Sequence, residues 1–158
     1  MSTRASIYRH PIHPMLVVFP LGLWIFAFIC YVVYMANGVP SWRVASLYAM
    51  AGGIIGAVLA AVPGLIDLLT LRRSGVWAIG VTHMVSNVSA LILFIIAFAI
   101  GVTRDVPGVA TLVLSAVGLI AVCVGGWLGG ALVYEHGVGV GRRQRQEAPE
   151  LQEVESHR

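Results

Sequence analysis

The sequence contains no lysine, and few of its 158 residues carry a charge. Charged residues make up 11% of the chain, against about 25% in a typical soluble domain. Apolar residues make up 58%, and the mean hydropathy is +0.88. So little polar surface cannot cover the apolar surface of this chain. A soluble fold is therefore excluded, a membrane protein is expected, and the length favours a single domain.

Cysteine is also scarce, because only Cys30 and Cys123 are present and neither belongs to a C-x-x-C or C-x-x-C-H motif. This excludes a disulfide framework and covalently attached haem, and we interpret both thiols as small hydrophobic side chains. The G-x-S-x-G, P-loop and H-E-x-x-H motifs are absent as well, so the soluble enzyme classes find no support. The net charge of +3 follows from membrane topology and does not indicate a nucleic-acid partner.

The sequence does have four long apolar segments, at about residues 15–35, 44–71, 76–100 and 109–134. Each reaches the roughly 20 residues that cross a bilayer as a helix, which satisfies its own backbone hydrogen bonds. The connections are short and rich in turn residues, so neighbouring segments run antiparallel. We expect an all-α fold, a four-helix antiparallel transmembrane bundle over residues 1–141. The charged residues 142–158 are expected to form a flexible cytoplasmic tail.

The arginines are distributed unevenly between the two ends of this expected bundle. Only Arg43 and Arg104 fall at one end. The other end holds Arg4, Arg9, Arg72, Arg73, Arg142, Arg143, Arg145 and Arg158. Because positively charged loops stay in the cytoplasm, both termini are predicted to be cytoplasmic.

Ionisable side chains gather at this arginine-rich end. The antiparallel topology brings one or more of them to this level from each segment: His10, His13, Asp67, His83, Glu135 and His136. Ionisable groups at such a depth usually face the bundle interior and pair with one another. Neutral imidazole binds metals, and Asp67 or Glu135 could accept the second ring N–H and fix the tautomer. This level is therefore the candidate site.

A b-type haem is the first interpretation, because four-helix bundles hold haem through histidines on facing helices. His13 and His83 lie on the first and third segments, which are diagonal in the simplest bundle, and are the preferred ligands; His10 or His136 are the alternatives. The haem propionates would meet the arginines at the interface: Arg9, Arg72 and Arg73. Such a protein would carry electrons to or from a quinone or a redox partner protein, and would not be a stand-alone enzyme. The glycines of the second and fourth segments could admit the ring, or only allow close helix packing.

Two further interpretations stay open. The first is a divalent transition-metal ion, bound or transported, because imidazole and carboxylate suit such ions and the site offers more ligands than a haem needs. Its candidate ligands are His10, His13, His83, His136 and Asp67. Few polar residues occupy the other halves of the segments, which argues against transport. The second is a structural or assembly subunit whose histidines form a hydrogen-bond network. Self-association is left open by the sequence.

Four stretches resemble a family of small bacterial membrane proteins catalogued as domain of unknown function 2231: "HPIHPMLVVFPLGLW", "PGLIDLL", "THMVSN" and "GGWLGGALVYEHGVGV". The resemblance covers about residues 8–141. It implies a four-helix unit in the bacterial inner membrane, sometimes joined to redox modules such as Rieske-type domains, which favours electron transfer. The family pattern maps onto His10, Pro11, His13, Pro14, Pro20, Asp67, His83, Asn87, Gly126, Gly130 and His136.

Overall fold

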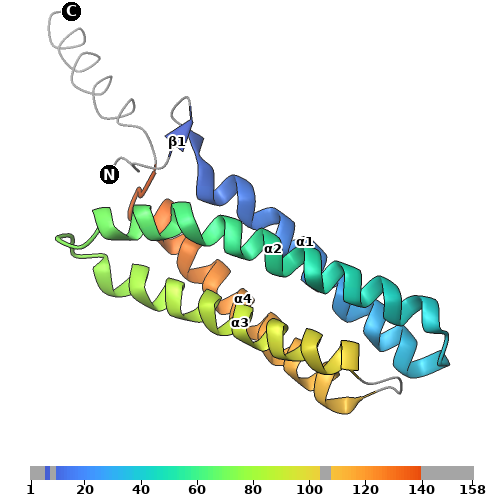
Figure 1. Ribbon diagram of the computed structural model, residues 1–158. Coiled ribbons are helices and arrows are strands. Elements are labelled where there is room, and N and C mark those ends of the chain that lie inside the picture. The colour runs from blue at the N-terminus through green and yellow to red at the C-terminus, as the bar shows by residue number, and fades with distance from the viewer. Residues whose placement is uncertain (1–5, 8–9, 104–107, 140–158) are drawn as a thin grey trace, which may run out of the picture.

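The computed structural model describes residues 6–7, 10–103 and 108–139, and its framework is four long helices (Figure 1). They are α1 (Ile12–Asn37), α2 (Pro40–Thr70), α3 (Trp77–Thr103) and α4 (Val109–Tyr134). Two-residue strands β1 (Ser6–Ile7) and β2 (His10–Pro11) pair in antiparallel fashion just before α1. The expected four-helix bundle is confirmed, and the tail from residue 142 onward lies outside the described residues.

The helices begin and end where the backbone chemistry allows. Pro14 and Pro40 lie in the first turns of α1 and α2, where a missing N–H is tolerated. Gly38 turns the chain between these helices at a φ of +69°, a value that favours glycine. Three helices are longer than the apolar segments indicated: α1 starts at Ile12, α2 at Pro40, and α3 continues to Thr103. Polar residues therefore extend the helices past the hydrophobic runs.

All four helices are long and apolar enough to cross a membrane, with mean hydropathies between 2.1 and 2.5 over their most apolar windows. The shortest have 26 residues and span about 39 Å, which exceeds the roughly 30 Å hydrocarbon core. Large apolar side chains such as Phe19, Val62 and Ile120 point outward, more than half exposed. Many interior positions hold small residues, which is typical of helix packing in lipid.

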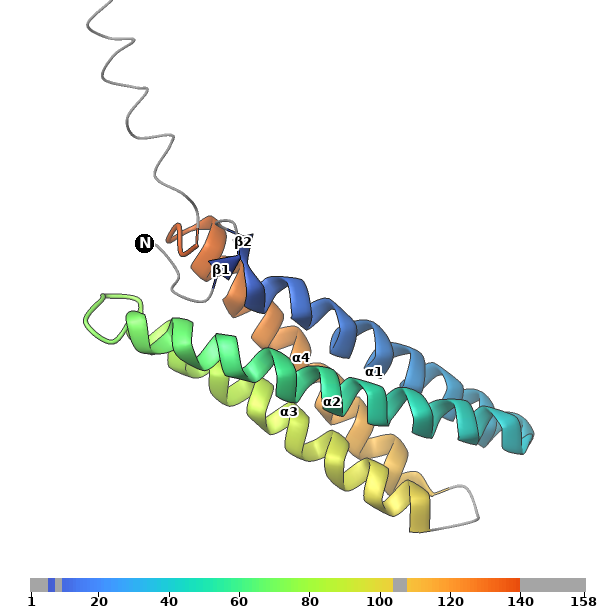
Figure 2. The ribbon, with the colours of Figure 1, turned by 45° about the horizontal axis from the view of Figure 1, so that its top comes forward.

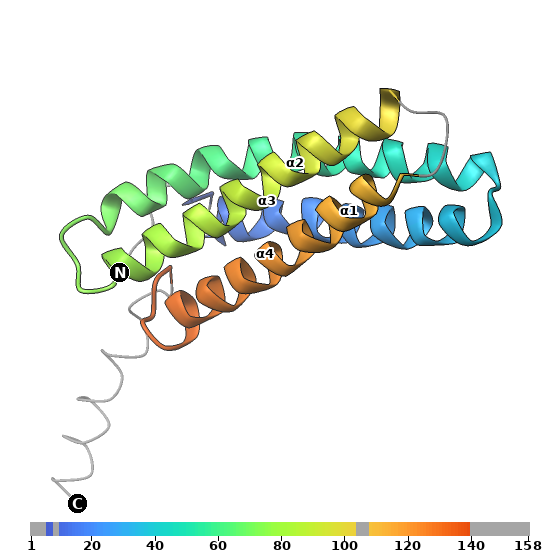
Figure 3. The same cartoon turned by 90° about the horizontal axis from the view of Figure 1, so that it is seen from below.

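The bundle consists of two tightly packed helical hairpins. α1 packs along α2, and α3 along α4, whereas contacts between the hairpins are sparser (Figures 1 and 3). The start of α1, the α2–α3 connection and the end of α4 all lie at one end (Figure 2). Trp24 of α1 stacks on Phe94 of α3 across the bundle, with ring centroids 4.3 Å apart and an interplanar angle of 5°. The first and third helices are therefore diagonal, as the sequence predicted.

The two hairpins are similar to one another in sequence. The stretch from His13, "HPMLVVFPLGLWIFAFICYV", aligns without gaps with "HMVSNVSALILFIIAFAIGV" from His83. Residues 44–64 of α2, "VASLYAMAGGIIGAVLAAVPG", align in the same way with residues 109–129 of α4, "VATLVLSAVGLIAVCVGGWLG". Such self-similarity marks an internal repeat, and parallel repeats of this kind are related by an axis along the membrane normal.

The packing repeats with the sequence. Trp24 covers Gly53 in the first hairpin, and the corresponding Phe94 covers Gly118 in the second, each so closely that an added Cβ would collide with the ring. Trp24 and Phe94 then meet each other. Contacts between equivalent residues are the mark of two-fold packing. The interior of the bundle is therefore built around a pseudo-two-fold axis, on which α1 faces α3.

Candidate histidine site

His13 is held against the second helix of its own hairpin. It is the second residue of α1, and its Nδ1 lies 2.8 Å from the carbonyl oxygen of Ala60 in α2. The ring rests on Gly64, where a Cβ would lie 2.8 Å from Nδ1. Because a carbonyl oxygen can only accept, Nδ1 carries the hydrogen, and the neutral ring keeps a lone pair on Nε2.

His83 repeats this arrangement in the second hairpin. Its Nδ1 donates to the carbonyl oxygen of Gly125 in α4 over 2.8 Å, and its ring rests on Gly129, where a Cβ would lie 3.0 Å from Cε1. Gly125 and Gly129 are the positions that correspond to Ala60 and Gly64 in the alignment of the two hairpins. His83 lies within the first two turns of α3.

The two imidazoles meet between the hairpins. Their ring centroids are 5.9 Å apart, and the ring planes are nearly perpendicular, at 83°. Both rings are half-buried, and in both the Nδ1–H is engaged by a backbone carbonyl. A backbone acceptor on one ring nitrogen fixes the orientation and tautomer of a histidine whose other nitrogen binds a metal. The geometry therefore engages Nδ1 of both rings with backbone carbonyls and brings the two rings together between the hairpins.

Asn87 is a polar neighbour of His83 that has no polar equivalent in the first hairpin. Its Nδ2 donates to the backbone oxygen of His83 over 2.8 Å and lies 3.5 Å from each nitrogen of the His83 ring. The absence of a side chain at Gly125 makes room for it, since a Cβ there would lie 2.6 Å from Nδ2. The first hairpin has Val17 and Ala60 at the corresponding positions. The environments of the two histidines therefore differ on this side.

Of the other candidate ligands, the described His136 and Asp67 do not gather with the pair. His136 follows α4, is exposed, and its Nδ1 bonds to Ala131 of the same helix over 3.1 Å. Asp67 is half-buried in the last turns of α2. The backbone of His10 lies in β2, and its side chain is outside the described part. Among the described residues, no three of His, Cys, Asp and Glu gather where they could hold a metal ion.

The arginines expected to face haem propionates are only partly described. Arg72 and Arg73 are exposed in the α2–α3 connection, at the histidine end of the bundle. Arg9 lies outside the described residues. Of the glycines, Gly64 and Gly129 contact the histidines, whereas Gly126 and Gly130 have open space where a Cβ would go.

The internal repeat is the sequence signal that would have distinguished His13 and His83 from the other candidate ligands. In the alignment of the two hairpins, His13 matches His83, whereas Asp67 matches Leu132, His136 matches Leu71, and His10 matches Gly80. Only one of the candidate ligand positions is therefore duplicated. The same alignment would also have found Gly64 and Gly129 as the positions beneath the rings.

One comparison with known proteins agrees with a membrane protein. The family model described as "Predicted membrane protein (DUF2231)" matches residues 9–142. No curated protein and no solved structure matches the chain. Since the matched region contains all four helices and both histidines, the chain belongs to the DUF2231 family of predicted membrane proteins.

Proposed function

We propose that this membrane protein binds a b-type haem between His13 and His83 and carries electrons. The observation that carries the proposal is the pair of Nδ1–H groups, each donated over 2.8 Å to the carbonyl of a neighbouring helix. Each ring is thereby oriented with its Nε2 lone pair available, which is the form of histidine that ligates iron.

The separation of the rings suits a metal held by both. A metal–imidazole bond of about 2 Å on either side, with the ring centre about 1 Å beyond, places two ring centres about 6 Å apart. The centroids of His13 and His83 are 5.9 Å apart. Both rings lie between the two hairpins, where the helices pack against one another most sparsely. A cofactor inserted there would disrupt the fewest helix–helix contacts.

Haem is favoured over a bare divalent ion because it needs only two protein ligands. Structural ions such as zinc usually take four ligands, and His136 and Asp67 do not gather with the pair among the described residues. The repeat duplicates one histidine and no other candidate ligand. A haem that His13 and His83 together would hold is consistent with this duplication.

Electron transfer follows from the ligand count. If His13 and His83 were both to hold the iron, the haem would supply electron transfer and not substrate binding. The exposed Arg72 and Arg73 lie at the same end as the pair, where propionates would meet them. By the positive-inside rule this end is cytoplasmic in the bacterial inner membrane, so a quinone or a redox partner protein would exchange electrons there.

The test is the optical spectrum of the purified protein, oxidised and after dithionite reduction. We expect a Soret band that shifts on reduction, and its loss in both His13→Ala and His83→Ala. His136→Ala is the matched control, because this exposed ring bonds to the end of its own helix, and it should keep the band.

Three results would contradict the proposal. A colourless wild type with stoichiometric metal by elemental analysis would favour the ion. A wild type that binds neither haem nor metal would favour a structural hydrogen-bond pair. A band that survives both substitutions would place the haem elsewhere.

A rescue experiment would support the proposal directly. A band restored to His83→Gly by added imidazole would show that the lost side chain acts as a ligand.

A further inference from the structure

Asn87 packs against the ring of His83 and is itself confined by two helices. Its Nδ2 donates to the backbone oxygen of His83 over 2.8 Å, which fixes the amide on α3. The same nitrogen lies 3.5 Å from each nitrogen of the His83 ring, so the amide rests against the ring and is not directed at one ring nitrogen alone. On its other side the amide fills the space above Gly125 of α4, where a Cβ would lie 2.6 Å from Nδ2. The ring therefore has a neighbour that cannot easily move away.

Gly125 serves the His83 ring in two ways. Its carbonyl oxygen accepts Nδ1–H of the ring over 2.8 Å, and its missing side chain admits Asn87. Gly129 lies beneath the ring, so described residues contact His83 on three sides. A side chain whose rotamer is fixed by packing and hydrogen bonds is a preorganised ligand.

His13 is held by fewer groups among the described residues. Its ring bonds to the carbonyl of Ala60 and rests on Gly64, and the residue one turn further along α1 is the apolar Val17. The Cβ of Ala60 also takes up the space that an amide would need. His13 is the second residue of α1, so its N–H is among the four at a helix start without an intrahelical acceptor, and helix ends open most easily. His83, the seventh residue of α3, lies past that turn.

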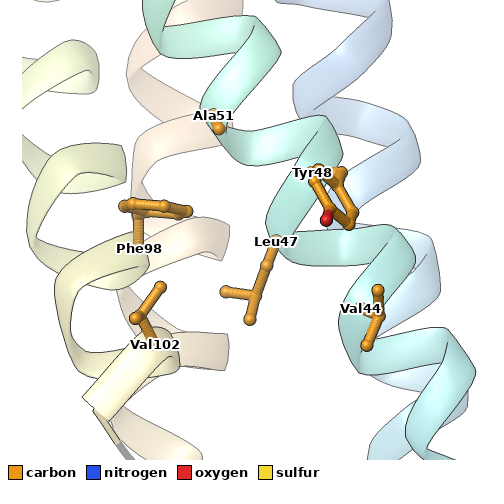
Figure 4. A pocket seen from close by; sticks show the side chains of 6 residues that line it. All are labelled: Val44, Leu47, Tyr48, Ala51, Phe98 and Val102. Atoms are coloured by element: carbon orange, nitrogen blue, oxygen red, sulfur yellow. The ribbon is translucent and has the colours of Figure 1, made fainter.

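The far end of the bundle shows that the two hairpins have not simply diverged everywhere. There an apolar groove of about 330 Å³ lies between α2 and α3, and Phe98 and Val102 face Leu47 across it (Figure 4). Five of its six lining residues recur unchanged in the other hairpin: Val44 as Val109, Leu47 as Leu112, Ala51 as Ala116, Phe98 as Phe28 and Val102 as Val32. This end of the two hairpins is therefore closely repeated.

Polar differences are concentrated around His83 instead. Ser86, Asn87 and Ser89 follow it along α3, at the positions where the first hairpin has three apolar residues: Leu16, Val17 and Phe19. Asn87 bonds to His83 itself. The amide is thus a feature that the second hairpin has at its histidine and the first does not.

We infer that Asn87 is a positioning residue, which holds the ring of His83 and makes His83 the firmer of the two histidines. For the proposed haem, on which this step rests, His13 is then the ligand that releases the iron more often. The groups that orient a metal ligand also set how tightly that ligand holds its metal. His83 keeps its orientation through Asn87 and Gly125, whereas His13 has no described counterpart of the amide.

The test is the rate at which the reduced haem protein takes up saturating carbon monoxide, a probe that can bind only after a histidine has left. Val17→Asn with Ala60→Gly gives the first hairpin the amide and the space for it, and should slow this uptake several-fold. Asn87→Val with Gly125→Ala leaves both histidines held as His13 is now. It should raise the rate, but not more than double it, because His13 already releases at that rate. Ser89→Ala, at an exposed position of α3, is the matched control and should change nothing.

A second measurement does not need the haem. In protein carrying isotopically labelled histidine, NMR reports how fast each imidazole N–H exchanges with water. We expect the N–H of His83 to exchange several-fold more slowly than that of His13. Asn87→Val with Gly125→Ala should remove most of this difference.

Equal exchange of the two imidazole N–H groups in the wild type would overturn the inference, and so would unchanged carbon monoxide uptake in Val17→Asn with Ala60→Gly. A colourless wild type would contradict the proposed haem instead, and the exchange measurement would still decide whether Asn87 holds His83. Because the exchange of His13 and His83 is compared within the wild type, a misfolded variant would not leave the inference untested.

Discussion

The two hairpins of this protein share one plan and differ at a few positions. Both place a histidine on a carbonyl of the following helix, rest it on a glycine, and cover a second glycine with an aromatic ring. The differences are local, such as Val17 against Asn87 and Tyr48 against Val113. The shared features build the interior of the bundle, whereas the differences mark the positions at which the two halves are not equivalent.

The largest effect that tests the equivalence of the halves is expected at the glycines beneath the histidines. In Gly64→Ala and in Gly129→Ala, the new Cβ would lie within about 3 Å of the imidazole and displace it from its carbonyl acceptor. Losing the partner that orients a metal ligand weakens binding by about 10-fold or more. For the proposed haem we expect a similar fall in retention in both variants, read from the Soret absorbance per protein.

Gly126→Ala and Gly130→Ala are the matched controls, because a Cβ at either position meets no atom within 4 Å. If Gly64→Ala lost the haem and Gly129→Ala kept it, the two histidines would not be equivalent ligands. If the controls were as severe as the tests, the loss would reflect altered helix packing in general.

The next largest effect is expected at Asn87 and Gly125, a contacting pair in the second hairpin that has no equivalent in the first. Gly125→Ala should destabilise the protein by about 1–3 kcal/mol, because the Cβ would lie 2.6 Å from Asn87 Nδ2. The double variant Asn87→Val with Gly125→Ala restores the pair found in the first hairpin and should recover most of that loss. Contacting residues typically couple by about 0.5–3 kcal/mol. Thermal unfolding of the four proteins of this cycle in detergent gives the coupling.

Additive destabilisation in that cycle would show that the backbone around Gly125 excludes a Cβ for a reason other than Asn87. The reciprocal variant, Val17→Asn with Ala60→Gly, provides the control. It should fold, since it installs in the first hairpin the combination that the second already accommodates.

The smallest effect is expected at Ser46 and Thr111, which are equivalent positions in the two hairpins. Both side chains carry a hydroxyl, but in the described structure only that of Ser46 has a hydrogen-bond partner. Ser46 Oγ, fully buried, donates to Ala27 O over 2.8 Å. Its counterpart Thr111 is equally buried, and its Oγ1 has no hydrogen-bond partner in the described structure. Ser46→Ala should lower stability by about 0.6 kcal/mol, the average for hydrogen bonds between membrane helices. Thr111→Val should cost nothing or stabilise slightly in the same unfolding measurement.

A loss in Thr111→Val as large as that in Ser46→Ala would mean that Thr111 donates in solution as its counterpart does. The difference between the halves at this position would then disappear.

Hydropathy predicted the fold well and the helix ends less well. The fourth segment, expected at 109–134, is α4 to the residue. The first was expected to begin at Met15 and begins at Ile12, because a helix can include a polar His13 beside Pro14 before its apolar run starts. The site was predicted in part: His13 and His83 do meet, whereas His136 turns back onto its own helix end. Topology places a residue at a depth and leaves open the direction of its side chain.

The sequence by itself determined the four spanning helices and their antiparallel order, because the length of an apolar run and the shortness of a loop are one-dimensional properties. It also contained the duplication of the histidine hairpin. Only the tertiary structure decided that His13 and His83 face each other with both Nδ1–H groups engaged, and that Asp67 and His136 do not join them among the described residues. The physical reason is that the rotation of each helix about its own axis depends on how small residues pack against the neighbouring helices. Hydropathy carries no information about that packing.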